Sequence, residues 1–179
     1  MLEQVEKVLI SEEQLMERVK ELGQQITEDY KEKNLLVIVI LKGAVIFASD
    51  LIKQVKLPLA MDFMAVSSYG ASTKSSGVVR ILKDLDEQVE GKDILIVEDI
   101  VDTGLTLHYL IENLLSRKPN SIKVCCCLDK PTSRTADVEV DYVGFSIPDE
   151  FVIGYGLDYA QKYRNLPYIG VLAQEAYKK

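Results

Sequence analysis

The feature that most constrains the fold is an unbroken apolar segment, Ile94–Val97, that runs directly into the carboxylates Glu98, Asp99 and Asp102. A parallel strand buried between two layers is apolar on both faces, so this segment predicts such a strand with the acids at its carboxyl end. Beyond the acids, the apolar spacing of residues 107–115 is helical. The order of strand, loop and helix predicts a ligand site where the strand ends, as in other open α/β sheets.

The loop between this strand and this helix, Thr103-Gly104-Leu105-Thr106, suits a phosphate group. Backbone amides at the start of a helix bind anions, and glycine lets the chain approach the anion closely. The carboxylates in front of the loop accept hydrogen bonds from hydroxyl groups. A ligand that carries both hydroxyls and phosphate satisfies both features, and the simplest such ligand is a ribose phosphate.

Strand and helix patterns alternate along the middle of the chain, which is typical of a parallel sheet with crossover helices. A capping box at Ser11 and Gln14 begins an amphipathic helix with one apolar stripe, at Leu15, Val19, Leu22, Ile26 and Tyr30. The later elements are expected, in chain order, at Leu35–Leu41, Ala44–Val55 (a helix), Ala60–Ser67, Val78–Leu82, Ile94–Val97, a helix to about Arg117, Ile122–Leu128, Val138–Phe145 and Phe151–Ile153. The irregular chain ends are expected to pack together as a smaller cap over the carboxyl edge of the sheet.

Composition excludes several classes of protein. The chain has 179 residues, enough for one domain with a sizeable core, and its net charge of −7 argues against a general nucleic-acid binder. The longest aliphatic run, Leu35–Leu41, is far shorter than the roughly 20 residues of a membrane helix, and the first ten residues lack a signal-peptide apolar region. The adjacent Cys125, Cys126 and Cys127 predict buried strand residues, because metal sites need wider spacing. We expect a cytoplasmic protein that binds neither membranes nor nucleic acid.

Five segments together resemble one enzyme family. The segment Val97–Thr106 resembles the diphosphoribosyl-binding motif of type I phosphoribosyltransferases. Four further segments narrow the resemblance to the hypoxanthine-guanine phosphoribosyltransferases of the short bacterial kind: Leu41–Gly43, Ser67–Gly70, Leu128–Pro131 and Phe151–Arg164. The resemblance covers the chain from about residue 10 to its carboxyl end. It implies an α/β type I phosphoribosyltransferase fold, with a central mostly parallel sheet flanked by helices and a small hood formed by the chain ends.

The resemblance also implies a domain plan, a reaction and its partners. A single domain over residues 1–179 is expected to have its core at about 35–135 and its hood at the N-terminal segment and about 140–179. The reaction is purine salvage, in which the 5-phosphoribosyl group of 5-phosphoribosyl-1-diphosphate moves to N9 of hypoxanthine or guanine and gives IMP or GMP and pyrophosphate. Mg²⁺ is the expected cofactor, and family members are homodimers or homotetramers.

The motif residues take their expected roles from the resemblance. Asp102 is expected beside N7 of the purine, where it would exchange a proton and stabilise a cationic sugar, although it is also placed to cap the next helix. The 5′-phosphate is expected on Asp102, Thr103, Gly104, Leu105 and Thr106. Many relatives carry lysine where this chain has Leu105, so amides and hydroxyls must hold the phosphate here. Glu98 and Asp99 are expected on the ribose hydroxyls, directly or through Mg²⁺, rather than as solvated loop acids.

A second group of residues is expected on the pyrophosphate. Leu41, Lys42 and Gly43 would bind it together with Arg164, and the family has a cis peptide bond between Leu41 and Lys42. Asp158 is matched to the residue that holds Mg²⁺ on this side, so the expected metal ligands are Glu98, Asp99 and Asp158. The alternatives are a surface lysine after a strand and an exposed ion pair between Asp158 and Arg164.

The remaining residues are expected around the base. The Lys130 ammonium would donate to O6 of a 6-oxopurine, where adenine presents a donor and is rejected. Phe151 would stack on the base, Val152 would offer backbone atoms to its edge, and Asp158 belongs to the same site. Ser68 and Tyr69 are expected at the root of a lid, residues 68–77, although a plain surface loop is the commoner reading of such a segment.

A regulatory protein of the same fold is the alternative class of function. Such a protein senses the diphosphate or a nucleotide and binds RNA or DNA, often through a basic face or an added segment. This chain is acidic, shows no such extension, and keeps an acid at Asp102. These features favour the enzyme.

Overall fold

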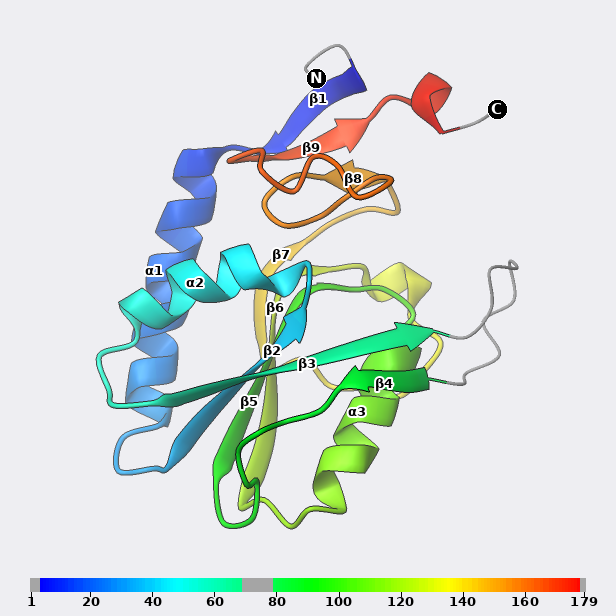
Figure 1. The fold of residues 1–179 in the computed structure, drawn as a ribbon. Coiled ribbons are helices and arrows are strands. Elements are labelled where there is room, and N and C mark those ends of the chain that lie inside the picture. Colours follow the sequence, from blue (N-terminus) through cyan, green and yellow to red (C-terminus); the bar gives the residue numbers. More distant parts are fainter. Residues whose placement is uncertain (1–3, 69–78, 178–179) are drawn as a thin grey trace.

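The computed structural model describes residues 4–68 and 79–177 and shows two sheets (Figure 1). The main sheet has the strand order β4-β3-β2-β5-β6-β7, and a small sheet has the order β1-β9-β8. The elements are β1 (Val5–Ile10), α1 (Glu12–Asp29), β2 (Leu35–Leu41), α2 (Ala44–Gln54), β3 (Ala60–Ser68), β4 (Val79–Lys83), β5 (Asp93–Val101), α3 (Leu105–Leu115), β6 (Ser121–Asp129), β7 (Tyr142–Ser146), β8 (Val152–Ile153) and β9 (Ile169–Leu172), with 3-10 turns at Pro131–Ser133 and Gln174–Ala176. Among the described strands of the main sheet, β3 and β4 pair antiparallel and the other neighbours pair parallel. The expected α/β class is confirmed.

Helices cover both faces of the main sheet, with α1 and α2 on one face and α3 on the other (Figure 1). Alternate residues of each central strand face opposite layers. Val37 and Leu95 pack with α1 and α2, whereas Ile38 and Ile96 pack with α3. Burial on both faces explains why these strands read as continuous apolar runs.

The amphipathic helix α1 begins as its sequence predicts. The Gln14 amide donates to Ser11 Oγ at 3.2 Å, and the Ser11 amide donates to Gln14 Oε1 at 2.9 Å, which completes the capping box. The predicted apolar stripe is buried throughout, at Leu15, Val19, Leu22, Ile26 and Tyr30. This face anchors α1 against the sheet.

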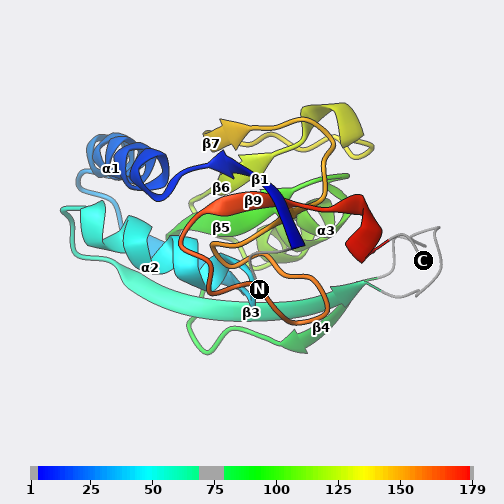
Figure 2. The ribbon, with the colours of Figure 1, turned by 90° about the horizontal axis from the view of Figure 1, so that it is seen from above.

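The chain ends form the small sheet. We call this sheet and the loop 154–166 together the hood. β1 pairs antiparallel with β9, and β9 pairs antiparallel with β8. The hood lies over the end of the main sheet where β2 and β5 terminate (Figures 1 and 2). The expected hood of chain ends is confirmed, but its segments are regular strands, because they complete their backbone hydrogen bonds by pairing with each other across the length of the chain.

Several boundaries differ from the prediction. β5 continues to Val101, four residues past the apolar run, because β6 supplies parallel partners as far as Asp129. Glu98 and Asp99 therefore lie in the last part of the strand instead of after it, and Asp102 follows its end. β7 begins at Tyr142, not at residue 138, and the backbone just before it is held by the Asp141 carboxylate, which accepts from the Val124 amide at 2.8 Å.

The cysteines and the apolar segments have the structural roles that the sequence predicts. Cys125, Cys126 and Cys127 are buried in β6 and carry free thiols, as predicted. Burial raises the pKa of each thiol, which opposes formation of the reactive thiolate. Within residues 4–68 and 79–177, no helix has the length and apolar character needed to cross a membrane.

Asp62 in β3 is a buried carboxylate, 4 % exposed, that holds the connection between β4 and β5. It accepts hydrogen bonds from the amides of Phe63 at 2.7 Å, Asp86 at 2.8 Å and Glu87 at 2.7 Å. Burial opposes its ionisation, but these amides and the Lys83 ammonium outweigh burial and lower the pKa of Asp62 below its usual 3.8. The ionised carboxylate therefore stabilises the fold.

We expect Asp62→Asn to lower the free energy of unfolding at neutral pH by about 2 kcal/mol, or Tm by roughly 4–8 °C, because the amide cannot accept from three donors. Because the pKa of Asp62 is lower in the folded than in the unfolded protein, its carboxylate stabilises the fold at pH values above the unfolded pKa. This stabilisation is lost as the pH falls through the folded pKa. The deficit should therefore shrink below pH 3.8. Thermal unfolding at neutral and acid pH checks this, with the exposed Asp86→Asn as control. An equal deficit at both pH values would contradict it.

Candidate functional site

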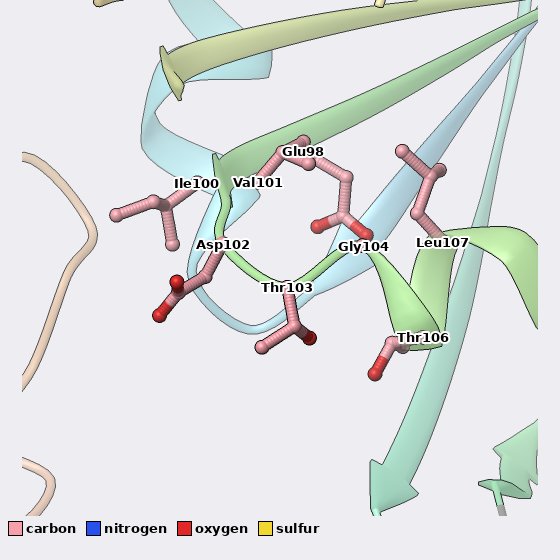
Figure 3. Close-up of a pocket in the computed structure, with 8 residues that line it drawn as sticks. All are labelled: Glu98, Ile100, Val101, Asp102, Thr103, Gly104, Thr106 and Leu107. Atoms are coloured by element: carbon pink, nitrogen blue, oxygen red, sulfur yellow. The ribbon is translucent and has the colours of Figure 1, made fainter. Parts of the chain in front are cut away.

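A pocket opens where β5 ends and α3 begins (Figure 3). It is lined by Glu98, Ile100, Val101, Asp102, Thr103, Gly104, Thr106 and Leu107. The side chains of Asp102, Thr103 and Thr106 project from the same side of the loop (Figure 3). The structure thus brings most of the predicted ribose and phosphate residues to this pocket, although Asp99 and Leu105 do not line it.

The loop 102–106 presents backbone amides to this pocket. Gly104 is the N-cap of α3 in a left-handed conformation, φ 82°, and a Cβ there would lie 2.7 Å from a Val138 methyl carbon, so the turn requires glycine. In the part of the chain that the structure describes, no hydrogen bond engages the amides of Thr103, Gly104 or Thr106. These donors, at the start of an 11-residue helix, suit an anion. The alternative role of Asp102 as helix cap is wrong, because Gly104 occupies that position.

Two adjacent acids, Glu98 and Asp99, carry unfavourable charge at the strand end. Burial, followed by the charge of Asp99, raises the pKa of Glu98 well above its usual range. Burial raises the pKa of Asp99 to about 6, although the Ile100 amide and the Arg164 guanidinium act in the opposite direction. Arg164, from the hood, is thus a positive partner of Asp99. Hydroxyl donors or a cation would stabilise the ionised pair further.

The end of β2 packs directly against Asp99. The peptide bond between Leu41 and Lys42 is cis, as the resemblance implied. A Cβ built on Gly43 would lie 1.6 Å from Asp99 Oδ2, and a Cβ on Gly156 would lie 2.0 Å from the Gly43 carbonyl oxygen. Two glycines therefore let the strand end, the acid and the hood loop approach one another closely.

The hood loop brings Arg164 and Asp158 to Lys42. Arg164 donates to the Gly156 carbonyl at 2.7 Å and pairs with Asp158 at 3.1 Å. The ion pair between Asp158 and Arg164, which was the alternative to a pyrophosphate site, is therefore present. It lies near Lys42, to which Gln161 connects it. Asp158 contacts Arg164 and Gln161 and so groups with the pyrophosphate residues, whereas it was also expected at the base.

Gln161 also belongs to this group, although no sequence motif predicted it. Its Oε1 accepts from both Lys42 Nζ and Arg164 Nη2 at 3.2 Å, so one amide holds the two predicted pyrophosphate cations together. Gln161 has a positive φ of 64°, as do its neighbours Ala160 and Tyr163. Such conformations in non-glycine residues cluster at functional sites, but a sequence pattern does not reveal them.

Lys130, which follows β6, is buried with 7 % of its surface exposed. Its ammonium donates to the Glu150 carbonyl at 2.8 Å and approaches Asp149 Oδ1 at 3.3 Å. An ammonium has three donors, so one remains for a ligand. Lys130 is therefore both a support of the 149–150 turn and a candidate donor.

Phe151 and Val152 follow this turn. Val152 is buried in β8, and Phe151 is 39 % exposed. The Phe151 ring stacks on Tyr177, with centroids 5.0 Å apart and planes at 25°, and meets Tyr159 edge to face at 5.7 Å. An exposed aromatic ring that two other rings hold in place suits a stacking platform.

The described residues contain no group of three or more acids, cysteines or histidines that would hold a metal ion alone. The three predicted ligands thus do not form a ready-made cluster. Mg²⁺, however, commonly takes one or two protein carboxylates and completes its octahedron with water and substrate phosphate oxygens. Asp99 and Asp158 repel each other, and Arg164 offsets their charge in part, so the two carboxylates fit a cation that arrives with a diphosphate.

The predicted lid is described only at its first residue. Ser68 ends β3, and Tyr69 with the rest of the segment to residue 77 lies outside the described residues. The lid therefore stays a prediction. Acids at a strand end, an anion-binding loop and cations under a hood are typical of α/β proteins that bind phosphorylated ligands.

Comparison with known proteins narrows this class. Residues 9–160 match the family model described as phosphoribosyl transferase domain. The hypoxanthine-guanine phosphoribosyltransferase of Bacillus subtilis (strain 168) is 59% identical over 97% of both chains, and that of Streptococcus thermophilus (strain CNRZ 1066) is 52% identical over 98% of this chain and 97% of its own. A crystal structure of a hypoxanthine phosphoribosyltransferase from Staphylococcus aureus has a TM-score of 0.97 at 52% identity, and the match covers 99% of this chain and 96% of that one. The chain therefore belongs to the phosphoribosyl transferase family.

Proposed function

We propose that this phosphoribosyltransferase transfers the 5-phosphoribosyl group from 5-phosphoribosyl-1-diphosphate to hypoxanthine or guanine, with pyrophosphate as the second product. The observation that carries the proposal is the convergence of β5, Gly43 at the end of β2 and the hood loop on Asp99. A ligand with a phosphate, two hydroxyls and a diphosphate would place its phosphate on the loop 102–106, its hydroxyls on the acids of β5 and its diphosphate on the cations under the hood. The identity of 59% to the Bacillus subtilis hypoxanthine-guanine phosphoribosyltransferase supports the choice of base.

The phosphoribosyl end of the substrate fits the loop 102–106. The free amides of Thr103, Gly104 and Thr106 would bind the 5′-phosphate, with Leu105 contributing backbone and no charge. Glu98 and Asp99 would accept from the ribose hydroxyls, and this contact would compensate the cost of ionising them in a buried place. The exposed Asp102 carboxylate would exchange the purine proton and stabilise positive charge on the sugar.

The diphosphate end fits the second group of residues. Lys42 and Arg164, already held together by Gln161, would donate to the pyrophosphate, and the planar fork of arginine suits its oxygens. Mg²⁺, when bound, would neutralise the leaving pyrophosphate. Asp99 and Asp158 are the carboxylates that would hold it, with Glu98 next to them.

The base would lie between Lys130 and Phe151. The third donor of the Lys130 ammonium would meet O6 of hypoxanthine or guanine, and the ring of Phe151 would stack on the purine. Backbone groups of Val152 would contact the edge of the base. We also propose that the chain forms one domain whose hood supplies both the base platform and the pyrophosphate arginine.

Gly43→Ala tests the contact between β2 and Asp99. The Gly43 backbone is right-handed helical, φ −60°, so alanine is tolerated there, and the clash at 1.6 Å falls on the Asp99 carboxylate. We expect the variant to fold but to raise KM for 5-phosphoribosyl-1-diphosphate about tenfold, because the acid must turn away. Steady-state kinetics check this, and thermal unfolding of the same variant confirms that it folds. An unchanged KM would show that Asp99 does not act from this position.

The reaction is tested by nucleotide formation from 5-phosphoribosyl-1-diphosphate and Mg²⁺, with hypoxanthine, guanine, xanthine, adenine and uracil offered separately. Turnover of hypoxanthine and guanine, with adenine and uracil inert, is the expected result. No turnover of any base, combined with tight binding of the diphosphate, would overturn the enzyme and favour the regulatory class. Binding of RNA that weakens steeply with salt would support that class directly.

A further inference from the structure

The carbonyl groups of the phosphate-binding loop are held from behind by one segment, residues 130–136. The Val101 carbonyl accepts from the Lys130 amide at 2.9 Å. The Thr103 carbonyl accepts from the amides of Thr135 at 2.9 Å and Ala136 at 3.1 Å. Because these oxygens face away from the pocket, the loop can turn its amides toward an anion.

Arg134 holds the middle carbonyl and ties this segment together. Its Nε donates to the Asp102 carbonyl at 3.2 Å, its Nη1 donates to the Val138 carbonyl at 3.4 Å, and its Nη2 pairs with the Asp129 carboxylate at the end of β6. The Arg134 and Asp129 side chains are 19% and 14% exposed, so this pair is largely shielded from water. A lysine cannot make this set of bonds, because it lacks the planar fork.

The stem of Arg134 also packs on the back of the turn. A Cβ on Gly104 would lie 2.9 Å from Arg134 Cδ. Arg134 therefore lies against the loop at two places, the Asp102 carbonyl and Gly104. It lies behind the loop, on the side opposite to the amides that would meet the phosphate.

We propose that Arg134 is a positioning residue, which aims the loop amides at the 5′-phosphate and holds the Asp102 backbone so that its carboxylate faces the reacting carbon. This inference rests on the proposed function, since it concerns the same phosphate site. Arg134 need not touch the substrate. It acts through the loop, and the Asp129 carboxylate at the end of β6 fixes its guanidinium.

Arg134→Gln tests this role, and Arg18→Gln is a matched control. Arg18 likewise donates to two backbone carbonyls, Gly144 at 3.0 Å and Val143 at 2.8 Å, but joins α1 to β7 away from the pocket. We expect Arg134→Gln to raise KM for 5-phosphoribosyl-1-diphosphate about tenfold and to leave KM for hypoxanthine within about twofold. Arg18→Gln should leave both values at those of the wild type.

A binding measurement separates positioning of the phosphate loop from a general loss of structure. IMP and inosine differ only in the 5′-phosphate, so the Kd of inosine divided by the Kd of IMP reports the loop alone. We expect this ratio to fall about tenfold in Arg134→Gln and to stay constant in Arg18→Gln. A folded Arg134→Gln variant with wild-type ratio and wild-type KM would overturn the proposal, and so would equal changes in the Arg18→Gln control.

Two further outcomes are distinguishable. If Arg134→Gln does not fold, Arg134→Lys keeps the charge beside Asp129 and should still lower the inosine-to-IMP ratio of dissociation constants about threefold. A Lys variant with wild-type values would overturn the proposal. If the wild type forms no nucleotide from any base, the proposed function fails, whereas the binding ratio still tests the role of Arg134.

Discussion

Asp102→Asn is expected to lower kcat for nucleotide formation by about 100- to 10,000-fold, while KM for 5-phosphoribosyl-1-diphosphate changes less than about threefold. Asparagine keeps the size and polarity of the side chain but cannot accept the purine proton or balance a cationic sugar. The Asp102 carboxylate is exposed at the pocket, and Gly104 takes over the role of helix cap, so the substitution removes no structural contact of the cap. The loss should therefore appear in turnover and not in folding.

The reverse reaction provides a second readout of Asp102. An enzyme cannot change the equilibrium constant, so pyrophosphorolysis of IMP must fall by a similar factor in Asp102→Asn. Steady-state kinetics in both directions measure this, with the exposed acid Asp137→Asn as control. Near-normal turnover in both directions would remove the acid–base role from Asp102 and leave it as a residue of the phosphate loop.

Lys130→Ala is expected to reduce the preference for hypoxanthine over adenine, measured as the ratio of kcat/KM, by about 100-fold or more. A site built to donate to O6 rejects a base that presents a donor there, and such polar mismatches reach about 10⁴-fold. Removal of the ammonium weakens the binding of hypoxanthine and also removes the repulsion between the ammonium and the amino group of adenine. Competition kinetics with both bases measure the ratio.

Lys130 also holds the turn that carries the base platform, so a control must separate the two effects. Lys7 pairs with the Glu150 carboxylate at 2.6 Å and supports the same turn from β1. Lys7→Ala loosens the turn without removing the donor to the base, and we expect it to leave the ratio unchanged. Equal losses in both variants would assign the preference to the turn at Glu150 and not to the Lys130 ammonium.

Local patterns account for most of the fold that could be predicted. The capping box at Ser11, the apolar stripe of α1 and the run at Ile94–Val97 each rest on interactions within a few residues, and each is confirmed. The predicted family is confirmed as well. Its motifs are short contiguous segments, so they can be identified from the sequence without knowledge of the fold. The boundary of β5 was missed because its last residues pair with β6, a partner that the strand itself does not encode.

The site divides in the same way. The sequence by itself determined which residue types follow β2, β5 and β6, since strand ends and helix starts are local properties. Only the tertiary structure decided that Gly43 meets Asp99, that Gln161 joins Lys42 to Arg164, and that Arg134 holds the phosphate loop. Apart from the bond between Gln161 and Arg164, these contacts join residues 32 or more positions apart along the chain, and Gln161 also needs a left-handed backbone. Their geometry arises when sheet and hood pack together, because only then do close approach and burial select one arrangement.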